Sequence, residues 1–90
     1  MKRCLSILIK GKVQGVFYRA SARDKATELG LTGFARNKED GSVHVVVEGE
    51  EDRLTEFEKW CWQGPPPAKV EQVLTVQEEI VNFAAFEIRR

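Results

Sequence analysis

The fold is decided by residues 5–19, LSILIKGKVQGVFYR, where the pattern of a strand gives way to a loop and then to a helix. Leu5, Ile7 and Ile9 recur at every second position, which is the spacing of one face of a β-strand. Residues 11–16 break this alternation with two glycines, which predicts a structured loop.

A helix is expected from about residue 19 to residue 29, because Ala22, Ala26 and Leu29 recur at helical spacing. Gly30 is well suited to end this helix, since glycine readily adopts the left-handed conformation that closes many helices.

The rest of the chain predicts a hairpin, a second helix and two further strands. Strands are expected at residues 32–37, 42–48, 70–76 and 85–89, with a helix from about residue 50 to 62. An Asp-Gly pair at 40–41 is a hairpin signal, and prolines at 65–67 stop the second helix. The order β-α-β-β-α-β with a short extra strand predicts an α+β, ferredoxin-like fold, with two helices on one face of a mainly antiparallel sheet. Residues 1–90 are expected to form a single domain.

The charge balance argues against a nucleic-acid partner. The 90 residues include 14 Lys+Arg and 14 Asp+Glu, whereas proteins that bind nucleic acids usually carry a basic surplus. No apolar run is long enough to span a membrane, and the first residues lack a signal-peptide pattern, so a cytoplasmic location without a membrane partner is expected. Cys4 and Cys61 lack CxxC spacing and are expected to be reduced. We also expect a monomer.

The predicted loop is a candidate anion site. It consists of Gly11, Lys12, Val13, Gln14, Gly15 and Val16. It precedes a helix whose first amides lack partners, and its glycines permit those amides to turn inward. Arg19 can then give two parallel hydrogen bonds to phosphate oxygens. The alternative is a tight connection with a solvent-exposed arginine, since the loop matches neither Walker A nor GxGxxG.

Asn37 ends the second predicted strand, just before the hairpin turn. It can be a simple turn residue, because asparagine readily bonds nearby backbone. In this topology, however, the end of that strand can lie near the start of the first helix, which would place Asn37 opposite Arg19. His44, the only histidine, falls on the outward face of its strand and is expected to be exposed. No metal-ligand spacing is present, so no metal or other cofactor is expected.

Two segments carry a resemblance to a known family. Residues 11–19, GKVQGVFYR, resemble the acylphosphatase signature G-x-V-Q-G-V-x-[F/Y]-R. Residues 33–37, GFARN, followed by DGSV at 40–43, are similar to the second segment of that family. The similarity continues to Phe86 and Ile88, so it covers essentially the whole chain.

The resemblance implies a ferredoxin-like fold, a small acyl phosphate as substrate and inorganic phosphate as product. It implies that Arg19 binds the phosphate, that Asn37 positions the attacking water and that the loop at residues 11–16 supplies a cradle of amides. Tyr18 stands where phenylalanine is commoner, so its hydroxyl needs a partner if the side chain is buried. Lys38 stands where many members carry an uncharged residue.

Acyl phosphate chemistry suits a chain with few candidate groups. The leaving carboxylate has a conjugate acid with a pKa of about 4, so it needs no general acid. We therefore expect water to attack phosphorus directly, with no metal and no phosphoenzyme.

Three alternatives share this fold. A module that only binds phosphate is separated from an enzyme by an activity assay. An RNA-recognition domain needs stacked aromatics, which the strands at 5–10 and 43–48 lack. The acylphosphatase-like part of a larger carbamoyl-transferring protein is disfavoured by the lack of zinc-type cysteine pairs.

Overall fold

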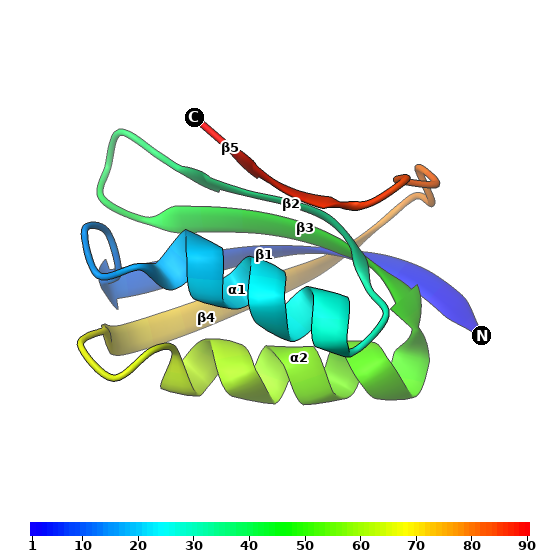
Figure 1. Cartoon of the computed structure of the whole chain (residues 1–90), viewed down its shortest axis with the longest axis horizontal. Coiled ribbons are helices and arrows are strands. Elements are labelled where there is room, and N and C mark those ends of the chain that lie inside the picture. The colour runs from blue at the N-terminus through cyan, green and yellow to red at the C-terminus, as the bar shows by residue number, and fades with distance from the viewer.

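The computed structural model describes residues 1–90 as two helices packed on a five-stranded sheet (Figure 1). In chain order the elements are β1 (Lys2–Lys12), α1 (Tyr18–Glu28), β2 (Thr32–Asn37), β3 (Val43–Glu50), α2 (Glu51–Gln63), β4 (Lys69–Glu78) and β5 (Phe86–Arg89). This order confirms the predicted ferredoxin-like arrangement with a short extra strand. None of the helices has the length and apolar character needed to cross a membrane.

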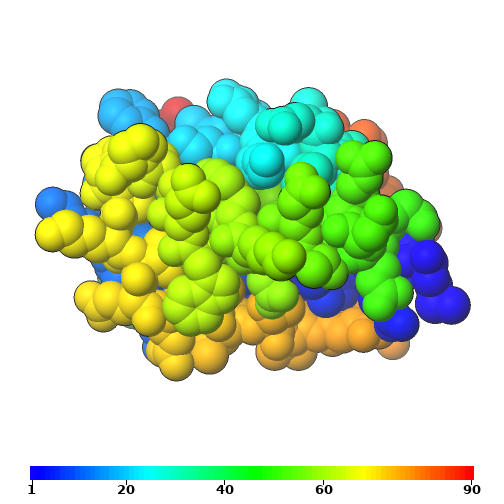
Figure 2. Space-filling view, turned by 90° about the horizontal axis from the view of Figure 1, so that it is seen from below, coloured from blue at the N-terminus to red at the C-terminus, as the bar shows by residue number.

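The strands lie side by side in the order β4-β1-β3-β2-β5. All neighbouring pairs are antiparallel except β2 and β5, which run parallel. Both helices cover the same face of the sheet (Figure 1), where α1 packs on β2 and β5 and α2 packs on β4, β3 and β1. Seen from below, α2 lies between α1 and β4 (Figure 2). Ile9 near the end of β1 pairs with Val43 at the start of β3. The loop after β1 and the β2–β3 hairpin therefore lie at the same end of the molecule (Figure 1).

The core between sheet and helices is formed by the predicted apolar faces. Val43, Val45 and Val47 of β3 are fully buried, as are Ile7 and Ile9 of β1. The helical side of the core contains the predicted stripes: Ala22, Ala26 and Leu29 from α1 and its end, and Leu54, Phe57 and Cys61 from α2. Each large apolar side chain buried in this way contributes about 1.5–3 kcal/mol, so the core holds α1 firmly against the sheet.

Tyr18 links the two helices at the start of α1. Its side chain is buried, and its hydroxyl donates a hydrogen bond of 2.7 Å to the backbone oxygen of Cys61 in α2. Its ring packs against Trp60, with centroids 5.3 Å apart. The hydroxyl thus has the partner that its burial requires, and the first turn of α1 is held in place.

The first strand is longer than its side-chain alternation predicted, and this changes the role of Gly11. Strand β1 continues to Lys12, and its pairing with β4 becomes irregular between Lys10 and Gly11. Gly11 has a φ of 129°, and a Cβ atom there would lie 2.2 Å from the backbone oxygen of Lys69. The glycine is therefore required by the close approach of β4. Backbone pairing also extends β3 and β4 past their predicted ends.

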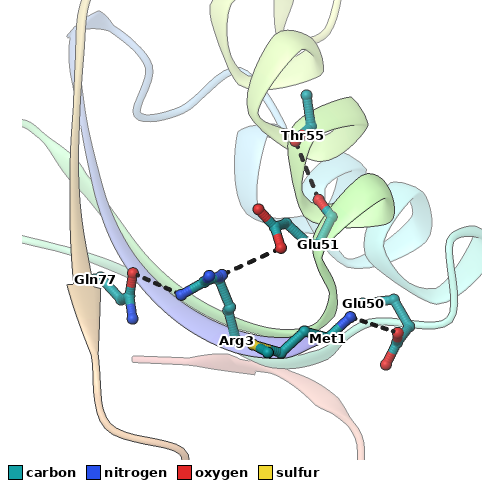
Figure 3. A network of polar contacts seen from close by, with 6 residues as sticks. All are labelled: Met1, Arg3, Glu50, Glu51, Thr55 and Gln77. Carbon is teal, nitrogen blue, oxygen red and sulfur yellow. Dashed lines mark hydrogen bonds and ion pairs between the residues drawn. The ribbon is translucent and has the colours of Figure 1, made fainter.

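A network of polar contacts at the start of β1 joins this strand to α2 and β4 (Figure 3). Arg3 lies 3.3 Å from the carboxylate of Glu51 in α2 and donates a hydrogen bond of 3.2 Å to Gln77 in β4. The amino group of Met1 lies 3.3 Å from Glu50. Exposed ion pairs of this kind contribute at most about 1 kcal/mol each, so the core remains the main support of the fold.

The two cysteines, Cys4 and Cys61, are free and buried, as expected for small apolar residues. Burial, together with the neighbouring Glu48, raises the pKa of Cys4 to about 11. Burial raises the pKa of Cys61 to about 12. Both side chains therefore remain thiols at neutral pH.

A buried carboxylate holds the loop that carries the chain from β4 to β5. These strands are at opposite edges of the sheet, so residues 79–85 must cross from one edge to the other. The carboxylate of Glu48 in β3 accepts hydrogen bonds from the amides of Val81 at 2.5 Å and Phe83 at 3.0 Å. Burial alone would raise the pKa of Glu48, but these amides and that of Asn82 hold it below its ordinary value.

Glu48→Gln should lower the free energy of unfolding by about 2–3 kcal/mol, because a side-chain NH2 group cannot accept a hydrogen bond from a backbone amide. Chemical denaturation at about pH 7 measures this loss. Glu87→Gln, on the exposed side of β5, is the matched control. Equal stability of the two variants would show that the loop does not depend on the buried carboxylate.

Candidate active site

A hollow of about 290 Å³ lies where the start of α1 meets the ends of β2 and β5. It is lined by Val13, Gly15, Phe17, Tyr18, Arg19, Ala20, Asn37, Ile88 and Arg90. Arg19 and Asn37, which the topology predicted to converge, thus border the same space. The lining includes two arginines and no Asp or Glu side chain, so the hollow favours an anion. No group of three or more His, Cys, Asp or Glu side chains is placed to hold a metal ion.

The backbone amides at the start of α1 have no acceptor within the protein. Phe17 is the N-cap of this helix, and its side chain makes no capping hydrogen bond. No hydrogen bond in the structure is donated by an amide of residues 14–20. Unpaired amides and the positive end of the helix dipole together form an anion-binding position.

The loop between β1 and α1 has an unusual backbone. Gly15 has a φ of 72° and Phe17 a φ of 64°, both in the left-handed region. For a phenylalanine this conformation costs about 1–3 kcal/mol, and such strain is concentrated at ligand sites. Val13 and Val16 are buried and anchor the loop in the core. Turns that contain left-handed residues bring successive amides together as an anion-binding nest.

Strands β5 and β2 place two polar side chains of the hollow, Arg19 and Asn37. Arg19, in the first turn of α1, donates a hydrogen bond of 2.9 Å from Nη1 to the backbone oxygen of Arg89 in β5. Asn37 is the last residue of β2. Because β2 and β5 run parallel, with Arg36 opposite Arg89, the ends of both strands reach the hollow together. The remaining N–H groups of Arg19 are left for a ligand.

Comparison with known proteins assigns this chain to a family. A family model described as Acylphosphatase matches residues 5–88. The chain belongs to the acylphosphatase family. Among the relatives, an acylphosphatase from Nitrosococcus oceani is 43% identical over 89 residues, which cover 99% of this chain and 100% of that protein. As a member of this family, the protein is a hydrolase that acts on acyl phosphates.

Solved structures of the family have the same fold. An acylphosphatase from Coxiella burnetii has a TM-score of 0.95 and 40% sequence identity, covering 98% of this chain and 93% of that chain. The acylphosphatase from Bacillus subtilis has a TM-score of 0.95 and 28% identity, covering 100% of both chains. These similarities confirm the family that the two sequence segments indicated.

Within this acylphosphatase fold, the residues of the predicted loop take different places. Val13 and Gly15 line the hollow. Gly11 and Lys12 belong to β1 and pair with β4, outside the hollow. The side chain of Gln14 bonds to the β2–β3 hairpin. The free amides of residues 14–20 therefore begin after the first three residues of the predicted loop and extend into α1.

Phe17, Ile88 and Arg90 also line the hollow, and the sequence did not predict them as site residues. Ile88 lies in β5 and Arg90 directly follows this strand. The alternation of side chains in β5 does not reveal which strand it pairs with. Phe17 occupies a variable position of the family signature, so the motif gives no signal for it. Phe17 is 79% exposed and has a left-handed φ of 64°, and these two features mark it in the structure.

His44 lies on the open face of the sheet, as predicted, but it is half-buried and was wrongly expected to be exposed. Arg36 donates from Nε to His44 Nδ1 at 3.2 Å, and Nε2 lies 2.8 Å from the hydroxyl of Ser6. Because Nδ1 accepts a hydrogen bond, the ring proton is assigned to Nε2, which donates to Ser6. A base would have to accept the proton of the serine hydroxyl. Because His44 donates to Ser6, these two residues are not arranged as a nucleophile and its base.

The environment of His44 predicts a pH dependence of stability. Burial, and then the positive charges of Arg36 and Lys38, lower the pKa of His44 below its ordinary value of 6.5. The unfolded chain therefore takes up a proton first, so stability is complete above about pH 6.5 and falls as the pH drops through the folded pKa.

His44→Gln should flatten the dependence of the unfolding free energy between about pH 7.5 and pH 5.5, because it removes the titrating ring. Urea denaturation across this range measures the slope for both proteins. Asp40 and Glu48, whose pKa values are lowered, lose their contributions only at more acidic pH. An unchanged slope in the variant would show that another group is responsible.

Proposed function

We propose that this protein hydrolyses the carboxyl–phosphate bond of small acyl phosphates by direct attack of water on phosphorus, with residues 1–90 acting as one domain. The observation that carries the proposal is a single hollow that combines Arg19, Asn37 and unpaired amides and is lined by no Asp or Glu side chain. The products are a carboxylate and inorganic phosphate. The reaction uses no metal and forms no phosphoenzyme.

The phosphoryl group binds at the start of α1. Its oxygens accept hydrogen bonds from the free amides of residues 14–20 and from the guanidinium of Arg19. The carbonyl of Arg89 holds the guanidinium in one orientation, so little order is lost on binding. The organic part of the substrate lies against the apolar side chains of Phe17 and Ile88, in the same hollow.

Asn37 holds the attacking water. Its side-chain oxygen accepts a hydrogen bond from the water. A bond forms between the water oxygen and phosphorus as the bond from phosphorus to the carboxyl oxygen breaks. The proton of the water passes to a phosphate oxygen, because no Asp, Glu or His side chain lines the hollow to act as a base. The carboxylate leaves without protonation, since its conjugate acid has a pKa of about 4.

Arg19→Ala and Asn37→Ala should each lower kcat by about 100- to 1000-fold, because each removes a group that stabilises or aims the transition state. Inhibition by inorganic phosphate separates the two roles. Arg19→Ala should weaken phosphate binding strongly, whereas Asn37→Ala should leave it nearly unchanged. The assay is hydrolysis of benzoyl phosphate with EDTA present.

Arg23→Ala is the matched control, since Arg23 lies one turn further along α1 and does not line the hollow. It should keep normal kcat. Near-normal turnover by either site variant would remove that residue from the mechanism. Turnover that stops when EDTA is added, or equal turnover of a phosphomonoester, would contradict the metal-free acylphosphatase reaction.

Hydrolysis in water labelled with heavy oxygen should place the label in the phosphate product and none in the carboxylate. Attack on phosphorus forms the new bond there, whereas attack on the carbonyl carbon would label the carboxylate. Mass spectrometry of both products after a single turnover gives the answer. Rapid acid quenching with radiolabelled substrate should trap no phosphorylated protein, and a trapped phosphoenzyme would overturn direct attack.

A further inference from the structure

We infer that Gln14 is a positioning residue that sets Asn37 against the amide cradle. The inference rests on the proposed role of Asn37 in holding the attacking water. Gln14 belongs to the loop that leads into α1, whereas Asn37 ends β2, so the two halves of the hollow come from separate parts of the chain. Their relative placement needs a direct connection.

The side chain of Gln14 makes that connection with both of its N–H donors. Its Nε2 atom donates a hydrogen bond of 2.7 Å to the backbone oxygen of Lys38 and another of 2.9 Å to the backbone oxygen of Ser42. No other hydrogen bond joins the loop at residues 13–17 to the hairpin turn at residues 38–42. Lys38 directly follows Asn37, so the connection reaches the hollow one residue away from the proposed water ligand.

The two carbonyls that Gln14 contacts also define the shape of the turn. The oxygen of Ser42 accepts from the amide of Lys38 at 2.9 Å, and the oxygen of Lys38 accepts from the amide of Gly41 at 3.2 Å. Asp40 holds the turn from within, through the amide of Ser42 at 3.0 Å and its hydroxyl at 2.5 Å. The turn is thus internally ordered, and Gln14 fixes where it sits relative to the loop.

The loop side of this connection is equally firm. Val13 is 1% exposed and Val16 is 6% exposed, so the residues on either side of Gln14 and Gly15 are anchored in the core. A side chain that extends from such an anchor can set a distance, because neither of its ends is free to move. The side chain of Gln14 therefore acts through Asn37 and does not itself touch the substrate.

Gln14→Met keeps the length of the side chain and removes both donors. It should lower kcat for benzoyl phosphate by about 10- to 100-fold, because a misplaced water ligand loses much of its effect. Inhibition by inorganic phosphate should change by less than about threefold, since the amides and Arg19 remain. Gln14→Lys, whose ammonium can donate to both carbonyls, should recover part of the lost kcat.

A double-mutant cycle with Asn37→Ala decides whether Gln14 acts through Asn37. If it does, Gln14→Met should have almost no further effect on kcat in the Asn37→Ala background. Gln77→Met, which removes a hydrogen-bonding glutamine at the opposite end of the sheet, is the matched control and should keep normal kcat. Thermal unfolding of every variant ensures that activity is measured on folded protein.

The outcomes separate this inference from the proposed function. Normal kcat in Asn37→Ala would overturn the proposed role of Asn37 and, with it, this inference. A low kcat in Asn37→Ala with additive effects of the two substitutions would overturn the inference alone. Normal kcat in Gln14→Met, or a loss of phosphate binding as large as the loss of kcat, would do the same.

Discussion

The amides at the start of α1 find no acceptor inside the protein, and the site depends on that constraint. A helix normally satisfies such amides with a serine, threonine, aspartate or asparagine at its N-cap, which stabilises it by about 1 kcal/mol. Here the N-cap is Phe17, which offers nothing to accept a hydrogen bond. Because α1 is held by buried Ala22 and Ala26, its free amides are fixed in direction before a ligand arrives. Donors fixed in this way stabilise developing charge without reorganising during the reaction.

Local patterns were sufficient to predict the elements that hold this helix. Val43, Val45 and Val47 alternate as a buried strand face must, and Leu54, Phe57 and Cys61 repeat as a buried helix stripe must. These elements left one common topology, and that topology brought Arg19 and Asn37 to one end of the sheet. The central residues of the site were therefore predictable because their placement follows from the order of elements.

Features that depend on contacts between distant segments were not predictable in this way. Gly11 was assigned to the anion loop, but its glycine is needed because the backbone of β4 approaches closely. Ile88 and Arg90 reach the hollow only because β5 joins β2, which its own alternation does not specify. His44 was expected to be exposed because its strand face is open, yet neighbouring side chains on that face half-bury it. In each case the cause is a strand pairing or a close contact between distant segments, which a short stretch of sequence does not reveal.

The loop before α1 shows why stability and activity compete at this position. A serine or aspartate in place of Phe17 would accept hydrogen bonds from the first amides of α1, and a glycine would relieve the left-handed φ of 64°. The amides cannot bond to such a cap and to a phosphate at the same time. The uncapped helix and the strained residue are therefore retained in one short segment, and the buried Val13 and Val16 that precede it anchor it in the core. A small domain can support this arrangement because the proposed chemistry needs only fixed donors and one aimed water.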